Sequence, residues 1–407
     1  MTPKAESIMA QKLMEIMMSE GTEGIKKIME VILNESMKVE RDEYLKAEPY
    51  ERTEMRRGYA NGYKDKQLNT RSGKLRILVP QVRGLPFYPK CIEKGTRSER
   101  ALKCAVAEMY VQGVSTRRVT EITEELCGLE ISSSQVSQIA KVLDEEVEKF
   151  KNRTIGAMPY LILDARYEKV RHLGCVRDVA VLIAIGVNPE GKREVLGFSA
   201  ALSEAEVHWR QFLESLVQRG LHGVEFIVSD DHQGLKNARK AMFPSVIWQR
   251  CQFHYQQNVT HHVPKVAMRK EIAAGIRTIF NAADRDDAEA KKQKFIAQYK
   301  DKAPALIAWV EITIDECLNV FSLPESFRVK LRTSNSLEKL NREIARRTKI
   351  ASIFPNEKSC LRLIGAVLVE IHEDWITRHE NYLNMNDKFE NDELKSQNFI
   401  IYRKKVA

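Results

Sequence analysis

The sequence predicts a mixed α/β domain that is interrupted by an all-helical insertion and preceded by a mainly helical region. Three observations predict this class. Strand and helix patterns alternate over residues 158–250, the strand signal disappears over 255–325, and helical periodicity dominates most of residues 1–152. At 407 residues the chain is also too long for one hydrophobic core, so about two to four domains are expected.

The composition is that of a globular protein with a mild excess of positive charge. Hydrophobic residues make up 43% of the chain, and no apolar run approaches the length of a membrane span. A signal-peptide core is missing and the seven cysteines are scattered, which predicts a cytoplasmic protein with no disulfide framework. The net charge of +9 is compatible with nucleic acid as a partner, and equally with the basicity of many other proteins.

Residues 1–55 are predicted to be helical, with a Met-rich apolar stripe. The stripe repeats at helical spacing, at Ile8, Met9, Leu13, Ile16 and Met17 and again at Ile25, Ile28, Met29 and Ile32. Two interpretations stay open: the stripe packs within its own domain, or it is a dimerisation element.

Residues 56–95 are predicted to form a small, basic, β-rich element. Gly, Asn, Pro and Thr separate short alternating segments, which is typical of strands joined by turns. Arginines, lysines and tyrosines are interleaved, a composition that suits contact with a DNA backbone. The alternative is an ordinary exposed basic hairpin.

Residues 96–152 contain two helices with helix-turn-helix spacing. Ser115 is the predicted cap of the first helix, and Ser133 or Ser134 that of the second. The predicted inward faces are Val119, Ile122 and Leu126, followed by Val136, Ile139 and Leu143. The outward polar and basic residues, which we expect to contact DNA, are Arg117, Arg118, Gln135, Ser137, Gln138 and Lys141. A plain helical hairpin remains the alternative.

Residues 153–254 have the strand order of a ribonuclease-H-like domain: three strands, then helix, strand, helix and strand. Asp164 lies inside the first, otherwise apolar strand, where an unpaired charge is costly. Asp230 ends the fourth strand, a place where a lone Asp is more often a turn former. Since the first and fourth strands are adjacent in such a sheet, the two carboxylates are expected to converge.

The all-helical insertion is predicted over residues 255–325, and the α/β domain resumes over 326–385. The polar segment 386–407 is a C-terminal tail to which the pattern assigns no role. A helix in the resumed part carries Glu338, which we expect to pack beside the two aspartates.

Glu338 begins a helical face that continues with cations. Arg342, at the i+4 position, offers a surface ion pair worth under about 0.5 kcal/mol. The other interpretation makes Glu338 the third acid of a site whose phosphates are contacted by Arg342, Arg346 and Arg347. Three converging carboxylates suit two Mg²⁺ or Mn²⁺ ions, which can activate a water or a 3′-hydroxyl for attack on a phosphodiester.

A Cys-x-x-His motif, Cys251 and His254, follows Trp248. By spacing alone it is half of a zinc site, which His261 and His262 would complete.

Several distinctive stretches occur together along nearly the whole chain. They are RRGYANGY, KLRILVPQVRG, YVQGVSTRRVTEI, YLILDARYEKVR, RGLHGVEFIVSDDHQGLKNA, WQRCQFHYQQN and RTSNSLEKLNREIARRTKIASIFPNEKSCLRLI. In this combination the sequence resembles the Mutator-type DDE transposases of bacterial insertion sequences. The resemblance implies that Asp164, Asp230 and Glu338 are the catalytic metal ligands, with Asp230 rather than Asp231 matching the pattern Ser-Asp-x-His-x-Gly-Leu. It also implies that Trp248, Cys251 and His254 support the site rather than bind zinc.

The function that this resemblance implies is Mg²⁺-dependent transposition. Such an enzyme binds the terminal inverted repeats of its insertion sequence, cleaves strands and joins them to target DNA, in the cytoplasm and in association with the nucleoid. We expect a homodimer, because two double-stranded ends must be brought together. A transposase-derived DNA-binding protein without chemistry is the first alternative, and the intact acidic triad argues against it. A ribonuclease-H-like nuclease or junction resolvase is the second, and the helix-turn-helix and long insertion argue against that.

Overall fold

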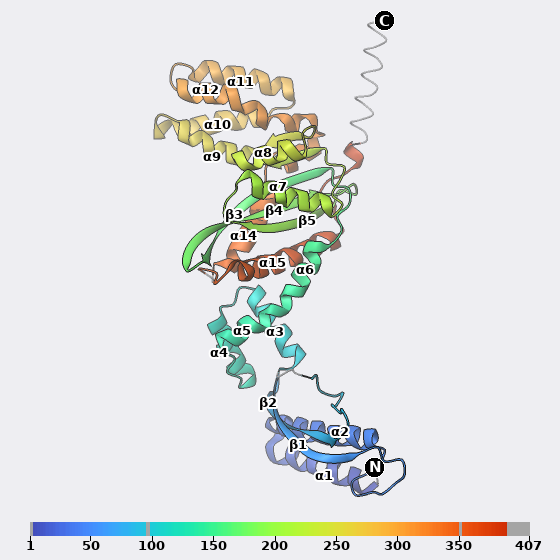
Figure 1. Cartoon of the computed structure of the whole chain (residues 1–407). Helices are drawn as coiled ribbons and strands as arrows, with labels where there is room; N and C mark the ends of the chain where they lie inside the picture. Colours follow the sequence, from blue (N-terminus) through green and yellow to red (C-terminus); the bar gives the residue numbers. More distant parts are fainter. Residues whose placement is uncertain (1–2, 95–97, 350–351, 389–407) are drawn as a thin grey trace. The chain divides into compact units, whose positions relative to one another are not determined.

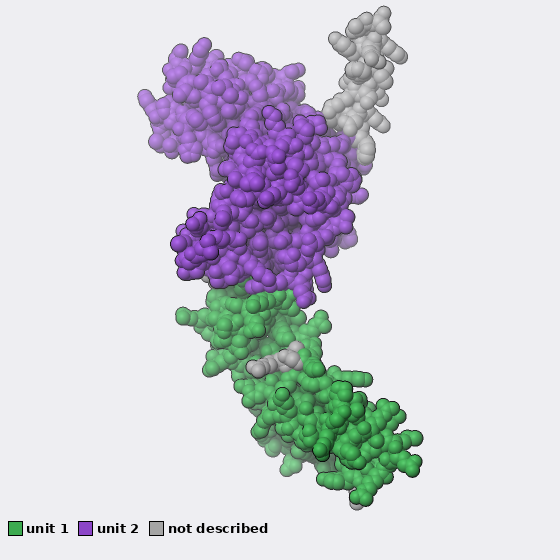
Figure 2. All heavy atoms as spheres, viewed as in Figure 1, with its two compact units in different colours: residues 1–142 green, residues 143–407 purple. Residues whose placement is uncertain are grey.

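The computed structural model describes residues 3–94, 98–349 and 352–388 (Figure 1). It divides into two compact units, Met1–Val142 and Leu143–Ala407 (Figure 2). The described residues combine α-helices with two β-sheets, so the predicted mixed α/β class and the mainly helical N-terminal region are confirmed. Most of the predicted tail, from residue 389 onward, lies outside the described residues.

The first unit begins with two helices and a β-hairpin. The helices are α1, Pro3–Glu20, and α2, Ile25–Leu45, which are separated by a 3₁₀ turn at Gly21–Gly24. The antiparallel strands β1, Tyr59–Thr70, and β2, Gly73–Arg83, form the hairpin that the alternating pattern predicts.

Helix α2 covers one face and one edge of this hairpin. Leu75, Ile77 and Val79 alternate inward from β2 and pack with Met37 of α2. The free edge of β2 is closed by side chains of α2, because Glu30 and Asn34 accept hydrogen bonds of 2.7 Å from the backbone of β2. Capping an edge in this way prevents it from pairing with another strand.

Part of the predicted Met-rich stripe is used in this packing, and part is not. Met29 packs against the hairpin core. Four members of the stripe are exposed instead: Ile8, Met17, Ile25 and Ile32.

Three further helices complete the first unit: α3, Arg100–Val111, α4, Thr116–Cys127, and α5, Ser133–Ile139. Ser115 caps α4 as predicted, accepting a 3.2 Å hydrogen bond from the backbone of Arg118. The helix ends at Gly128, whose φ of +61° is a conformation that glycine adopts without strain.

Two details of this helix pair differ from the prediction. Leu126 is 75% exposed, because the buried face of α4 runs through Val119 and Thr123. The cap of α5 is Ser132, not Ser133 or Ser134, and it forms a capping box with Gln135. A capping box requires Glu or Gln three residues after the cap, so Gln135 favoured Ser132 from the sequence alone.

The second unit is built on a five-stranded mixed sheet. Its strands are β3, Tyr160–His172, β4, Cys175–Val187, β5, Arg193–Ala201, β6, Phe226–Ser229, and β7, Ile247–Arg250. The spatial order is β5-β4-β3-β6-β7. Strands β3, β4 and β5 are antiparallel neighbours, whereas β6 is parallel to both β3 and β7. The first and fourth strands are therefore adjacent, as predicted.

Helices cover both faces of the sheet (Figure 1). Helix α7, Glu206–Gln218, and helix α8, Gln233–Met242, share one core with the strands, in which Trp209 is fully buried. On the other side α15, Glu357–Thr377, packs on β3, β5 and α6, Leu143–Asn152. The predicted domain boundary at residue 152 differs, since α6 belongs with the sheet.

The segment after β7 is helical, as predicted. Its helices are α9, Gln252–His262, α10, Arg269–Phe280, α11, Arg285–Tyr299, and α12, Pro304–Thr313, followed by 3₁₀ turns η4, Ile314–Cys317, and η5, Asn319–Ser322. They share a core of their own that includes Tyr255, Ile276 and Phe295. The chain then returns through α13, Glu325–Leu331, to α14, Asn335–Thr348, which packs on β3 and α15.

Among the helices of the described ranges, none combines the length and the apolar character that a membrane crossing needs.

Candidate active site on β3 and at the end of β6

Two of the predicted acids lie on neighbouring inner strands of the sheet, Asp164 within β3 and Asp230 directly after β6. Strands β3 and β6 are parallel, with Ile162 opposite Val228. Asp164 follows Ile162 by two residues and Asp230 follows Val228 by two, so the strand register brings both carboxylates to the same level. The convergence predicted from the strand order is therefore present.

Asp164 is held in place by two hydrogen bonds. Its Oδ1 accepts from the backbone N–H of Ala165 at 3.0 Å, and its Oδ2 from Nδ2 of Asn341 at 3.1 Å. The pKa of Asp164 is raised to about 6, mainly by burial and to a smaller extent by the charges of Asp230 and Glu204, while His254 and the bond from Ala165 lower it. Because Asn341 belongs to α14, its bond also joins that helix to β3.

Glu338 lies one turn before Asn341 on α14 and is half-buried. Burial raises its pKa, while His254 and Arg342 lower it. Its Oε1 is buried and has no hydrogen-bond partner within the described ranges. This oxygen does not fit the interpretation of Glu338 as half of a surface ion pair, since a buried carboxylate oxygen normally has a partner.

His254 lies near the three acids. Its Nδ1 lies 4.0 Å from Oδ1 of Asp230, and it influences the pKa values of Asp164 and Glu338. Burial lowers the pKa of His254, but Cys251, Asp230 and Asp164 outweigh that effect and raise it to about 9. The protonated imidazole therefore compensates part of the negative charge that the acids bring together.

The other signature residues fix the elements that carry the acids. Cys251 Sγ accepts from the backbone N–H of Ser334 at 3.3 Å and lies 3.2 Å from its hydroxyl, which holds the start of α14 against the end of β7. Trp248 donates its indole N–H to the hydroxyl of Ser229 at 2.9 Å, at the end of β6. His262, a candidate zinc ligand by spacing, stacks on Trp309 with ring centroids 4.5 Å apart.

The donor set suits a hard divalent cation, but it is open in this structure. In the part of the chain that the structure describes, no group of three or more His, Cys, Asp or Glu side chains is close enough to hold a metal ion. Three carboxylates, one with an unpaired buried oxygen, provide the oxygen ligands that Mg²⁺ and Mn²⁺ prefer.

The predicted phosphate contacts on α14 divide into two kinds. Arg342 and Arg346 are exposed, and Arg346 pairs with Glu343 at 2.7 Å. Arg347, the third predicted phosphate contact, is only 5% exposed, and its guanidinium pairs with Glu343 and with Glu370 of α15. Helical spacing places Arg347 on the buried face of α14, because the buried residues Leu337, Leu340 and Ile344 precede it by ten, seven and three residues.

The predicted DNA contacts of α4, α5 and the 3₁₀ turn Ala140–Val142, which carries Lys141, all belong to the first unit. Arg117, Gln138 and Lys141 are exposed there. Three others are engaged in local bonds: Arg118 with Glu121 at 2.7 Å, Gln135 in the capping box, and Ser137 with the backbone of Ser133 at 3.0 Å.

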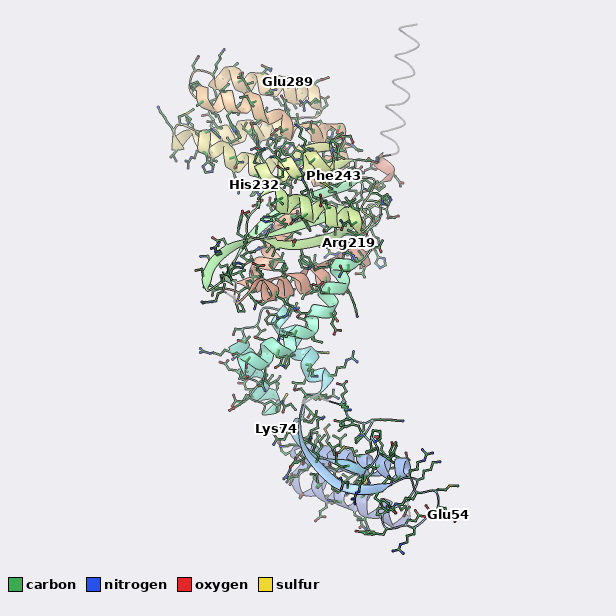
Figure 3. All side chains as sticks on the ribbon, in the orientation of Figure 1. Glu54, Lys74, Arg219, His232, Phe243 and Glu289 are labelled. Atoms are coloured by element: carbon green, nitrogen blue, oxygen red, sulfur yellow. The ribbon has the colours of Figure 1, made fainter. Side chains whose placement is uncertain are left out.

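Several residues around the acids were not predicted from the sequence. Asn341 could have been found, because it lies three residues after Glu338 on the same helical face. Glu204 gave no comparable signal; it lies 3.8 Å from His232, which precedes α8 and is labelled in Figure 3. Asp231, whose role the sequence left open, pairs with Arg250 at 2.8 Å and with Lys236 at 2.9 Å.

Comparison with known proteins gives consistent matches over nearly the full length. A family model described as transposase, Mutator family, matches residues 1–378. The chain is 52% identical over 372 residues to the transposase for insertion sequence element IS406 of Burkholderia multivorans, covering 91% of this chain and 96% of that protein. It is 42% identical to the transposase for ISRM5 of Rhizobium meliloti, covering 96% and 98%. Identity to the transposase for IS256 of Staphylococcus aureus is 38%, covering 89% and 93%.

Proposed function

Because the chain belongs to the Mutator family of transposases, we propose that it is a DNA transposase with an acidic active site at Asp164, Asp230 and Glu338. It binds the terminal inverted repeats of an insertion sequence, cleaves strands there and joins them to target DNA. The observation that carries this proposal is that Asp164 and Asp230 lie on neighbouring strands and that His254 acts on the acids through its charge, with a buried oxygen of Glu338 left unpaired.

The fold that we infer for the second unit is ribonuclease-H-like. Three antiparallel strands followed by two parallel ones, in the order β5-β4-β3-β6-β7, support this assignment. The helical segment from α9 to η5 is then an insertion between the last strand and the helix that carries the third acid.

Asp164, Asp230 and Glu338 would hold two Mg²⁺ or Mn²⁺ ions. When bound, such ions activate a water or a 3′-hydroxyl and stabilise the leaving oxygen of a phosphodiester. The remaining residues prepare the site: Asn341 orients Oδ2 of Asp164, and Cys251 fixes the start of α14. Protonated His254 offsets the repulsion among the acids in the absence of cations.

The proposed DNA contacts lie on both units. In the first unit α4 and α5 form the helix-turn-helix, and Arg117, Gln138 and Lys141 are its exposed candidates. On α14, Arg342 and Arg346 are placed to contact phosphates, whereas we assign Arg347 to the packing of α14 on α15. These contacts act on double-stranded ends and on target DNA.

A homodimer is the proposed assembly, since two transposon ends must be brought together. The exposed apolar residues of α1 support an association surface, and they include Ile8, Met14, Met17 and Met18.

Strand cleavage and joining on labelled element-end DNA with Mg²⁺ tests the proposal. We expect wild-type protein to cleave at the ends, and Asp164→Asn and Glu338→Ala to bind these ends without cleaving them. Asp178→Asn, which changes an exposed carboxylate on the neighbouring strand β4, is the matched control and should retain activity. Activity that survives in Asp164→Asn refutes the triad. Salt-sensitive binding without any cleavage by wild type would instead indicate a DNA-binding protein without chemistry.

A further inference from the structure

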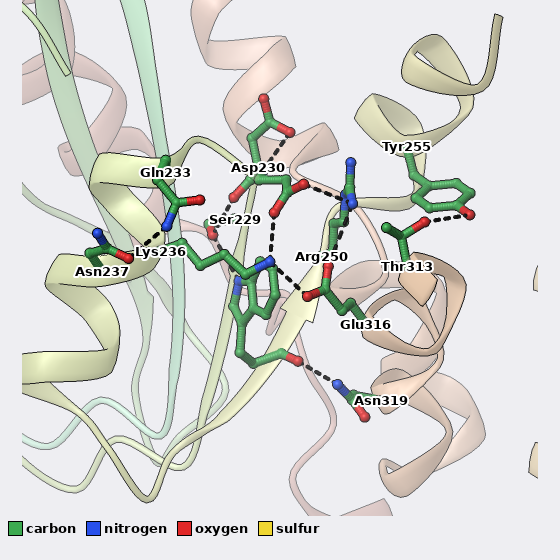
Figure 4. Close-up of polar contacts among 12 residues, drawn as sticks. Ser229, Asp230, Gln233, Lys236, Asn237, Arg250, Tyr255, Thr313, Glu316 and Asn319 are labelled. Carbon is green, nitrogen blue, oxygen red and sulfur yellow. Dashed lines mark hydrogen bonds and ion pairs between the residues drawn. The ribbon is translucent and has the colours of Figure 1, made fainter. Parts of the chain in front are cut away.

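Four charged side chains form a closed cluster beside Asp230: Asp231, Lys236, Arg250 and Glu316 (Figure 4). Arg250 lies 2.8 Å from Asp231 and 3.5 Å from Glu316, and Lys236 lies 2.9 Å and 2.7 Å from the same two carboxylates. Each carboxylate thus meets both cations, and the four charges sum to zero. The side chain of Arg250 is only 2% exposed, so its pairing is energetically significant.

Each member of the cluster comes from a different element. Asp231 follows β6, Lys236 lies on α8, Arg250 ends β7, and Glu316 belongs to η4 at the end of the helical insertion. Aromatic rings flank the cations: Lys236 lies 4.7 Å from the ring centroid of Trp248, and the guanidinium of Arg250 lies 5.0 Å and 5.5 Å from the centroids of Tyr255 and Trp309, which stack on each other. The cluster therefore joins the sheet, a covering helix and the insertion at one point.

Hydrogen bonds along β7 reinforce this junction. Gln249 donates to the carbonyl of Cys317 at 2.8 Å and accepts from the backbone N–H of Val320 at 2.7 Å. Asn319 donates to the carbonyl of Trp248 at 2.6 Å (Figure 4). Strand β7 is an edge strand of the sheet, so η4 and η5 occupy the place where a sixth strand would pair.

The cluster reaches the candidate site through one peptide. The backbone N–H of Asp231 donates to Oδ1 of Asp230 at 2.7 Å, while the side chain of Asp231 is fixed by Arg250 and Lys236. We propose that this cluster is the joint through which the helical insertion positions Asp230, with Glu316 as the positioning residue that the insertion supplies. The proposal rests on the proposed role of Asp230 as a metal ligand.

Glu316 links the insertion to Lys236 and Arg250, and its negative charge balances one of these two cations. Without its carboxylate, two cations would face Asp231 alone, directly beside Asp230. A surplus positive charge there would compete with a divalent cation for Asp230, in addition to loosening the peptide of Asp231.

Hydrogen exchange of the full-length protein, treated with EDTA, tests the joint without reference to activity. We expect Glu316→Gln to speed amide exchange in residues 228–233 as well as in 314–322, while α10 and α11 stay protected. Glu311→Gln, which changes an exposed carboxylate one turn earlier in the insertion, is the matched control and should change neither segment. If the faster exchange stays confined to 314–322, the proposed link between the insertion and Asp230 is refuted.

The Mg²⁺ dependence of strand cleavage, together with Mn²⁺ affinity by calorimetry, tests the positioning of Asp230. Glu316→Gln should raise the half-saturating Mg²⁺ concentration about tenfold, with a smaller effect on the rate at saturation. The double variant Glu316→Gln/Lys236→Met again has equal charges and should recover most of the lost affinity. Unchanged half-saturation, or no recovery in the double variant, overturns the positioning role. If wild type cleaves nothing, the proposed function fails, while the exchange experiment still decides on the joint.

Discussion

Replacing Asp164 by Asn should stabilise the protein at neutral and alkaline pH when divalent cations are removed. Burial and the neighbouring acids raise the pKa of Asp164 from 3.8 to about 6. The folded protein therefore binds this proton more tightly than the unfolded chain does. As the pH rises from about 4 to about 6, the folded state loses stability relative to the unfolded state, and above that range the loss is complete.

The size of this change in the free energy of unfolding follows from the pKa shift of Asp164. At about 1.4 kcal/mol per pKa unit, a rise from 3.8 to about 6 corresponds to about 3 kcal/mol. Asp164 is partly exposed, so solvent screens some of the interaction, and we expect about 2 kcal/mol. Asn cannot ionise, so the free energy of unfolding of the Asp164→Asn variant lacks this pH-dependent loss.

Urea unfolding of the EDTA-treated proteins at a series of pH values between 4 and 8 measures the difference. The free energy of unfolding of Asp164→Asn minus that of wild type should grow by about 2 kcal/mol across this range. Saturating Mn²⁺ should then stabilise wild type but not the variant. The exposed control Asp301→Asn should stay within about 0.5 kcal/mol of wild type throughout. A difference that does not change with pH would refute the reasoning, because it would mean that Asp164 ionises as easily in the folded protein as in the unfolded chain.

Two further predictions concern α14 and α8. Arg347→Ala should lower the free energy of unfolding by about 2 kcal/mol, because it removes the buried partner of Glu370. Arg346→Ala should leave the free energy of unfolding unchanged. It should instead reduce the salt dependence of DNA binding by about one phosphate contact. The reverse pattern in urea unfolding and salt titrations would contradict these assignments. Gly234→Ala should lower the free energy of unfolding by about 3 kcal/mol or more, since the added methyl carbon would lie 2.0 Å from the backbone oxygen of Glu204. The control Gly156→Ala, where nothing lies within 4 Å, should be tolerated, and equal thermal stability of the two variants would show that the contact relaxes easily.

The order of elements was predictable because it depends on local patterns. Apolar runs, turn residues and helical periodicity located the strands and helices, and the adjacency of β3 and β6 placed Asp164 beside Asp230. What the sequence could not show is which distant charge meets which. Arg347 looked like a surface cation because its partner Glu370 lies on another helix, and Asp231 looked unassigned because its partner Arg250 lies on another strand.

The ion pairs of Asp231 explain why Asp230, and not Asp231, is the proposed metal ligand. Both oxygens of Asp231 face cations, Oδ1 toward Lys236 and Oδ2 toward Arg250. A carboxylate that is already neutralised in this way is a poor ligand for a divalent cation, since binding would first have to break two ion pairs.

Asp230 has the opposite environment. Its Oδ1 receives one backbone N–H and lies 4.0 Å from His254, so most of its charge remains available to a divalent cation. Each acid is positioned by an uncharged neighbour: Asp230 by the backbone N–H of Asp231, Asp164 by the side-chain amide of Asn341, and Glu338 by the bond of Ser334 to Cys251. Such an arrangement keeps the site in register without neutralising the charges that we propose to bind the ions.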